Sequence, residues 1–298
     1  MAQCAVLAML FELSSSPKPG NVDRCHDFSE IRFHHFLTSA VSAYPVFRKA
    51  ASGEGSPGSL ILEGVAAWGD WNLRSNTHFG SLVLLIPLAL AAGLAAGQEK
   101  VQETRQYDGL ENGSDKPKKE LEEELARVLR STTVQDAVDF YRAFDLAGAR
   151  VVPVDEFSLK DQDWERKLIE GNQSLLELMR LSRDHDIVAR EWATDFERSF
   201  QLAGRLQEMV SIYGLNDGVV RTFLEALAEV PDSLISAKFG RERAEEVSRL
   251  AADALIDSTL KKAREMDCEL NNRDMNPGST ADLIAASLFI SLLRRLRF

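Results

Sequence analysis

Apolar residues recur along most of this chain at spacings of three and four, which places them on one face of an α-helix. Strand-like alternation occurs only in one short run, ARVVPVDEF at 149–157. The pattern therefore predicts an all-α protein with buried apolar central helices, and no repeat or break divides 1–298 into more than one domain. The segments with helical spacing are 3–13, 28–51, 60–71, 81–97, 120–149 as two helices, 164–179, 187–213, 219–228, 241–262 and 280–296.

The most apolar segment is SLVLLIPLALAAGLAAG, residues 81–97. It is slightly short for a membrane span of about 20 residues, it is rich in alanine, and Pro87 interrupts it. We therefore expect a buried core helix and no membrane partner. The following segment, 97–120, is polar and charged, which predicts an exposed linker, a flexible excursion or a lid.

The formal net charge of -11 argues against a nucleic-acid partner. Cys4, Cys25 and Cys268 lie far apart without the spacing of metal ligands, so we expect reduced thiols. The first apolar run has no basic start and is interrupted by Glu12, unlike a signal peptide. These features together predict a cytoplasmic protein.

The loop SSSPKPGNVDRCHD, residues 14–27, separates two helical segments. Prolines on either side of Lys18 restrict the backbone there, and a rigidly held lysine suits a phosphate or a carboxylate. Asp23 and Asp27 offer oxygen ligands to a hard cation. Taken alone, the stretch is explained more simply as a proline-stiffened connector with a solvated lysine.

The turn SNTHFG precedes the most apolar segment. Asn76 or Thr77 is a candidate N-cap, and the free N–H groups of a helix start attract anions. His78 is a candidate hydrogen-bond donor to a phosphate, or a proton carrier. An ordinary cap beside an exposed histidine is the simpler interpretation.

A second polar stretch, DHDIVAREWATDFE, places Asp186, Arg190 and Glu191 near one helix face. This spacing is typical of a salt-bridged surface. Trp192 and Phe196 are four residues apart and are predicted to lie in the core.

The last polar stretch, NPGSTADLIAASLF, begins at Asn276. Ser279 or Thr280 is the predicted N-cap of a final helix whose first turn holds Asp282. An acid is common there because it complements the helix dipole. The helix beyond is nearly all apolar, however, so this carboxylate would lie near the interior and need a partner such as a metal or an arginine.

Each signal is weak alone, but SSSPKPGNVDRCHD, NTHFG and NPGSTADLIA occur in this order and resemble the triphosphoribosyl-dephospho-CoA synthase family. The run PDSLISAKFG, which begins at Pro231, also resembles the family's Asp-x-Leu-Ile segment. The resemblance covers 11–289 and implies an all-α enzyme.

The resemblance implies a transferase that takes ATP and 3′-dephospho-CoA, or a related acceptor, and releases adenine. A 5-triphosphoribosyl unit is attached to the acceptor's ribose, giving the precursor of a lyase prosthetic group. Such a glycosyl transfer has an oxocarbenium-like transition state, beside which a carboxylate is useful. A triphosphate also calls for Mg²⁺ and basic donors.

The resemblance also implies the site residues, without dividing the roles among the acids. The catalytic candidates are Asp27, Asp232 and Asp282. The ligand-binding candidates are Lys18, Asn76, His78, Asn276 and Lys238. The Mg²⁺ candidates are Glu12, Asp23, Asp27 and Asp282.

Two alternatives stay open. The chain could be a nucleotide-dependent enzyme with a different acceptor, or a helical nucleotide-binding or scaffold protein without catalysis. The long apolar helices would also allow a homodimer.

Overall fold

The computed structural model describes residues 1–28, 31–73, 76–103, 116–148 and 163–298. Within these ranges every regular element is a helix, which confirms the all-α prediction. The β-like run at 149–157 lies outside the described residues. In chain order the helices are α1 (Ala2–Ser14), α2 (Phe33–Ser42), α3 (Tyr44–Ala51), α4 (Pro57–Ala66), the 3-10 helix η1 (Gly69–Trp71), α5 (Phe79–Glu103), α6 (Lys116–Arg130), α7 (Val134–Leu146), α8 (Trp164–Glu170), α9 (Leu175–Ser182), α10 (Ile187–Ala193), α11 (Glu197–Glu229), α12 (Ser233–Phe239), α13 (Arg241–Leu255), α14 (Lys261–Asn272) and α15 (Gly278–Leu293).

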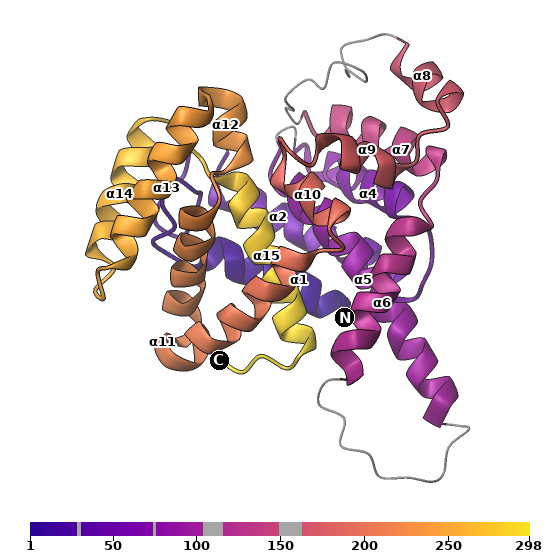
Figure 1. Cartoon of the computed structure of the whole chain (residues 1–298), viewed down its shortest axis with the longest axis horizontal. Helices are drawn as coiled ribbons and strands as arrows, with labels where there is room; N and C mark the ends of the chain where they lie inside the picture. The colour runs from indigo at the N-terminus through magenta and orange to yellow at the C-terminus, as the bar shows by residue number, and fades with distance from the viewer. Residues whose placement is uncertain (29–30, 74–75, 104–115, 149–162) are drawn as a thin grey trace.

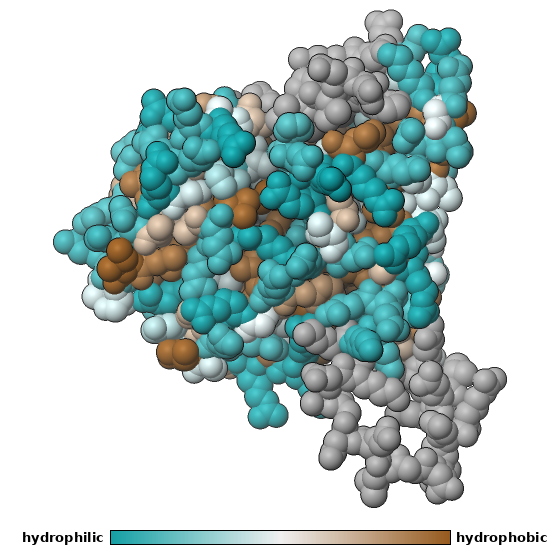
Figure 2. Space-filling view, in the orientation of Figure 1, coloured by the Kyte–Doolittle hydropathy of each residue, from teal (hydrophilic) through white to brown (hydrophobic). Residues whose placement is uncertain are grey.

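Helices α1, α5 and α15 form the centre of the molecule, where α15 packs against both others and against α11. Helices α11 to α14 lie on one side of this centre, and α4 and α6 to α9 lie on the other (Figure 1). One continuous hydrophobic core runs through both sides. The face shown in Figure 2 is mostly hydrophilic, with hydrophobic residues in scattered patches between the helices.

Helix α5 is the predicted core helix. Its span Phe79–Gly97 is long and apolar enough to cross a membrane by length and composition, yet 72% of the most apolar window is buried inside the protein. Pro87 has no N–H, so the carbonyl of Val83 lacks its helical donor. The indole Nε1 of the fully buried Trp192 donates to that carbonyl at 3.2 Å. The proline thus creates the contact by which α10 is fixed against α5.

Several boundaries depart from the sequence pattern. The predicted helix at 241–262 is two helices, because the chain turns before Leu260, which adopts φ +57°. The polar segment 97–120 continues α5 at one end and begins α6 at the other, and its middle, 104–115, lies outside the described residues.

The helix cap predicted for α5 is confirmed, and the one predicted for α15 is wrong. Asn76 Oδ1 accepts from the N–H of Phe79 at 3.3 Å, as predicted, and Thr133 caps α7. The predicted cap of α15 is wrong, because the helix already begins at Gly278 without a side-chain cap. Asp232, at the start of α12, accepts from the Thr280 N–H instead, at 2.7 Å.

Candidate active site

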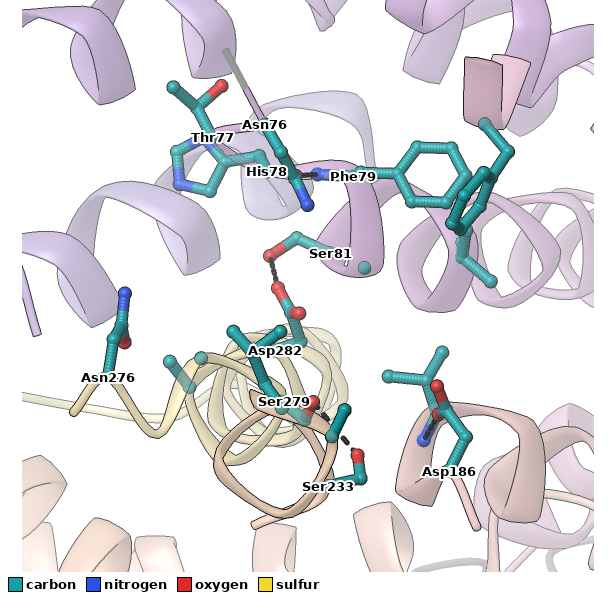
Figure 3. Close-up of a pocket in the computed structure, with 18 of the residues that line it drawn as sticks. Asn76, Thr77, His78, Phe79, Ser81, Asp186, Ser233, Asn276, Ser279 and Asp282 are labelled. Atoms are coloured by element: carbon teal, nitrogen blue, oxygen red, sulfur yellow. Dashed lines mark hydrogen bonds between the residues drawn. The ribbon is translucent and has the colours of Figure 1, made fainter. Parts of the chain in front are cut away.

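A cavity of about 740 Å³ opens where the first turns of α5 and α15 approach the loop that follows α1. Helices α7, α9 and α10 complete its walls. Figure 3 shows side chains from these separate elements pointing toward one space. The sequence-predicted residues that line it are Glu12, Lys18, Asn76, His78, Asn276 and Asp282.

Asp282 and Ser81 connect the two helix starts. The Ser81 hydroxyl donates to Oδ1 of Asp282 at 2.6 Å (Figure 3). The other oxygen, Oδ2, lies against Gly80, where any Cβ would overlap it. The partner that the sequence predicted for this acid, a metal or an arginine, is therefore a serine hydroxyl.

Burial raises the pKa of Asp282 to about 8, and the nearby carboxylates of Glu12, Asp232 and Asp186 add to the rise. The hydrogen bond from Ser81 lowers the pKa but does not outweigh burial. Asp282 is thus a neutral carboxylic acid at pH 7.

Lys18 is fully buried and pairs with Glu12 across the polar end of the cavity. Burial raises the pKa of Glu12, whereas the Lys18 charge lowers it. Among the described lining residues Lys18 is the one lysine or arginine. The first turns of α5 and α15 add partial positive charge on the same side of the cavity, which favours an anionic ligand.

His78 is buried rather than exposed, and it contacts Ser39 of α2. The Ser39 hydroxyl lies 2.6 Å from Nδ1 of His78 and 3.0 Å from the Phe36 carbonyl. Nε2 of His78 is buried without a hydrogen-bond partner. Burial, together with the Lys18 charge, lowers the pKa of His78 to about 3, so the ring is neutral at pH 7.

Asn276 lines the cavity from the turn before α15, and its Oδ1 is buried without a hydrogen-bond partner. Asn76 lines the cavity as the cap of α5. Unpaired buried polar atoms are costly, so their presence beside a cavity suits a ligand that completes their hydrogen bonds.

Of the four expected Mg²⁺ ligands, Glu12 and Asp282 line the cavity, whereas Asp23 and Asp27 do not. Asp23 is buried behind the loop, where it accepts from the N–H groups of Lys18, Cys25 and His26. Asp27 is exposed and accepts from the N–H of Phe33 at the start of α2. Among the described residues, no group of three His, Cys, Asp or Glu side chains is placed to share a metal ion. The four acids therefore do not fit together as a resident metal site.

Two further predicted residues lie outside the cavity lining. Asp232 is fully buried and accepts four hydrogen bonds, from the N–H groups of Leu234, Ile235 and Thr280 and from the Thr280 hydroxyl. Burial raises the pKa of Asp232 to about 6, although these hydrogen bonds lower it. Lys238 is exposed, with Nζ 3.3 Å from the Asp274 carbonyl.

The structure adds residues that the sequence did not single out as part of the site. Ser81 directly follows the NTHFG turn, and Asn21 directly follows PKPG, so both were adjacent to recognised motifs. Asp186, expected on a salt-bridged surface, instead caps α10 and lines the cavity. The apolar end is formed by side chains with no motif in the sequence: Phe79, Phe140, Tyr141, Phe144, Leu178 and Met179.

Comparisons with known proteins identify the family of this chain. The family model described as CitG, ATP:dephospho-CoA triphosphoribosyl transferase, matches residues 1–297. A crystal structure from Archaeoglobus fulgidus, assigned provisionally as a triphosphoribosyl-dephospho-CoA synthase, aligns with a TM-score of 0.67 and 28% identity over 88% of this chain and 100% of that one. No curated protein gives a significant match. The resemblance in the motifs is confirmed over the full length, and the chain belongs to the CitG family of ATP:dephospho-CoA triphosphoribosyl transferases.

Proposed function

We propose that the cavity between α5, α15 and the loop after α1 transfers the 5-triphosphoribosyl unit of ATP to a hydroxyl of 3′-dephospho-CoA or a related acceptor. In this reaction the bond between C1′ and the adenine N9 breaks, and its electron pair leaves with adenine. A bond forms between C1′ and the acceptor oxygen. The acceptor's proton goes to solvent, and the departing adenine needs a proton.

The observation that carries the proposal is the neutral carboxyl of Asp282. It is held by Ser81 against Gly80, and burial raises its pKa to about 8. A neutral acid at pH 7 can donate a proton to a leaving group, as the acid does in glycoside hydrolysis. Asp282 is therefore the proton donor to adenine, and solvent reprotonates it.

Lys18 is the phosphate contact, because it is a buried cation at the polar end of the cavity. Glu12 holds it there in the absence of a ligand. Nε2 of His78 and Oδ1 of Asn276 lack partners and form hydrogen bonds with ligand hydroxyl or amino groups. Mg²⁺ enters bound to the triphosphate, since the acids expected to hold it are engaged in the fold.

A non-catalytic nucleotide-binding protein is the second candidate. The observation in its favour is that the described cavity lining has one lysine, already paired with Glu12, to meet a triphosphate. The two candidates differ in one product, because only the transferase releases adenine.

The test is an incubation of the protein with ATP, Mg²⁺ and 3′-dephospho-CoA, followed by chromatography and mass analysis. We expect free adenine and an adduct heavier by one triphosphoribosyl unit. Asp282→Asn should lose at least about 100-fold in rate, the usual range for removing a general acid. Gln201→Ala, which changes an exposed residue paired with Glu197, is the matched control. Nucleotide binding without adenine release, with any acceptor tried, would support the second candidate.

A further inference from the structure

Helix α11 is broken at Gly214, far along the chain from every motif of the site. Gly214 adopts φ +77° and ψ 173°, a conformation that L-residues other than glycine rarely adopt. A Cβ at this position would meet nothing within 4 Å, so glycine is required by the backbone and not by crowding. The break starts a second helical half, and Asn216 lies in its first turn.

The side-chain amide of Asn216 makes two hydrogen bonds to the backbone of Ser16. Its Oδ1 accepts from the Ser16 N–H at 3.0 Å, and its Nδ2 donates to the Ser16 carbonyl at 2.8 Å. Arg24 also donates to Oδ1 at 2.7 Å, and Nδ2 also donates to Asp217 at 2.9 Å. The amide therefore uses its full hydrogen-bonding capacity, which fixes both its position and the assignment of its oxygen and nitrogen.

Ser16 lies two residues before Lys18, and the intervening chain is stiff because prolines flank the lysine on both sides. On the far side of the lysine, the Gly20 N–H donates to Asp267 of α14 at 3.0 Å. The loop is thus held before Lys18 by α11 and after it by α14. Because Pro17 restricts the backbone between Ser16 and Lys18, we expect a displacement of Ser16 to displace Lys18 as well.

We propose that Asn216 is a positioning residue of the site: it holds the loop at Ser16 so that Lys18 is presented to the cavity and to a phosphate group of the bound nucleotide. The assignment rests on the proposed function for the identity of the ligand. Asn216 lines no part of the described cavity and acts only through the loop.

The anchoring is tested first, without any ligand. Hydrogen exchange of residues 15–23 is measured by mass spectrometry in wild type, Asn216→Ala and the control Gln201→Ala, which changes an exposed side chain on the same helix. We expect faster exchange in N216A and no change in Q201A. Unchanged exchange in N216A would overturn the proposal, whatever the protein binds.

The effect on the site is tested by a double-mutant cycle. Calorimetry measures the Kd for ATP with Mg²⁺ in wild type, Lys18→Ala, Asn216→Ala and the double variant. We expect N216A to raise Kd by roughly tenfold, as loss of the two hydrogen bonds to Ser16 implies. In the K18A background the same change should raise Kd less than about twofold, because residues that act through one another are not additive.

Equal effects of N216A in both backgrounds would overturn the positioning role and leave the proposed function intact. A wild-type protein that binds no ATP would overturn the proposed function, and this assignment with it. If N216A does not fold, Asn216→Asp replaces it, since the carboxylate still accepts from the Ser16 N–H but cannot donate to the carbonyl. An intermediate rise in Kd is then expected, and an unchanged Kd would contradict the role.

Discussion

Ser81 donates a 2.6 Å hydrogen bond to Asp282 across a separation of 201 residues and joins the first turn of α5 to α15. Asp282 lies just beyond the first turn of α15, not within it as the sequence predicted. The contact brings two of the family motifs, NTHFG and NPGSTADLIA, to one point of the cavity. Burial raises the pKa of this acid to about 8, although the hydrogen bond from Ser81 lowers it.

The pKa of Asp282 makes stability depend on pH. The folded protein keeps the proton up to about pH 8, whereas the unfolded chain releases it near the ordinary pKa of 3.8. Between these values the folded state binds more protons, so this group's contribution to the free energy of unfolding falls as pH rises and levels off above about pH 8. Asp282→Asn removes this contribution and keeps an acceptor for Ser81.

We therefore expect the Tm of D282N minus that of wild type to increase from pH 5 to pH 8, by roughly 5 °C. Thermal unfolding of both proteins across that range measures the difference. Other titrating groups are common to the two proteins and cancel. A difference that does not vary with pH would mean that Asp282 is ionised in the folded state at pH 7.

Glycine is required at position 80 because the carboxyl group of Asp282 leaves no room for a Cβ. Gly80→Ala should displace Asp282, because the new Cβ overlaps Oδ2. A misplacement of about 1 Å can cost roughly 100-fold in rate, so we expect a loss of that order in adenine release. The matched control is Gly204→Ala, where a Cβ meets nothing within 4 Å and a helix gains about 0.5–1 kcal/mol. Equal activity of the two variants would contradict the close approach.

Trp192 replaces the hydrogen bond that Pro87 removes from α5. Trp192→Phe keeps most of the buried ring but leaves the Val83 carbonyl without a donor. We expect a loss of about 1–3 kcal/mol in the free energy of unfolding, measured by denaturant titration. Trp71→Phe, at a side chain that is 64% exposed, should change stability by less than about 0.5 kcal/mol. The contact is unimportant if both variants unfold at the same denaturant concentration.

Asp232 joins α12 to α15 through four hydrogen bonds. Asp232→Ala should lower the free energy of unfolding by about 2–4 kcal/mol, since it removes a helix cap and leaves buried N–H groups unpaired. Asp184→Ala, at an exposed side chain, is the control. A loss below about 1 kcal/mol would show that water or another group replaces the carboxylate readily.

Divalent cations should bind this protein only together with the nucleotide. Mn²⁺ is a spectroscopic substitute for Mg²⁺, and the signal of free Mn²⁺ reports how much is bound. We expect little binding to the protein alone and about one equivalent when ATP is added. The result would be contradicted if Mn²⁺ bound tightly without nucleotide and Asp23→Asn or Asp282→Asn abolished that binding. The protein would then have the resident metal site expected from the sequence.

Much of the fold could be predicted from the chain, because apolar periodicity reports which face of each helix is buried. Cap chemistry was predictable where it is local, as for Asn76 and Thr133. It failed for α15, where the hydrogen-bond acceptor is Asp232 from another helix. The chain turn before Leu260 interrupts the predicted segment 241–262, whose residue pattern continues across it. The break at Gly214 instead directly follows the end of the predicted segment 187–213.

The sequence by itself determined that the protein is helical, that α5 is a core helix and that three ordered motifs belong to one site. These properties depend on periodicity and on residues close together in the chain. Only the tertiary structure decided the raised pKa of Asp282, the burial of His78 and the anchoring of Lys18 by Asn216. The physical reason is that burial and hydrogen-bond partners set these properties, and the partners come from distant parts of the chain.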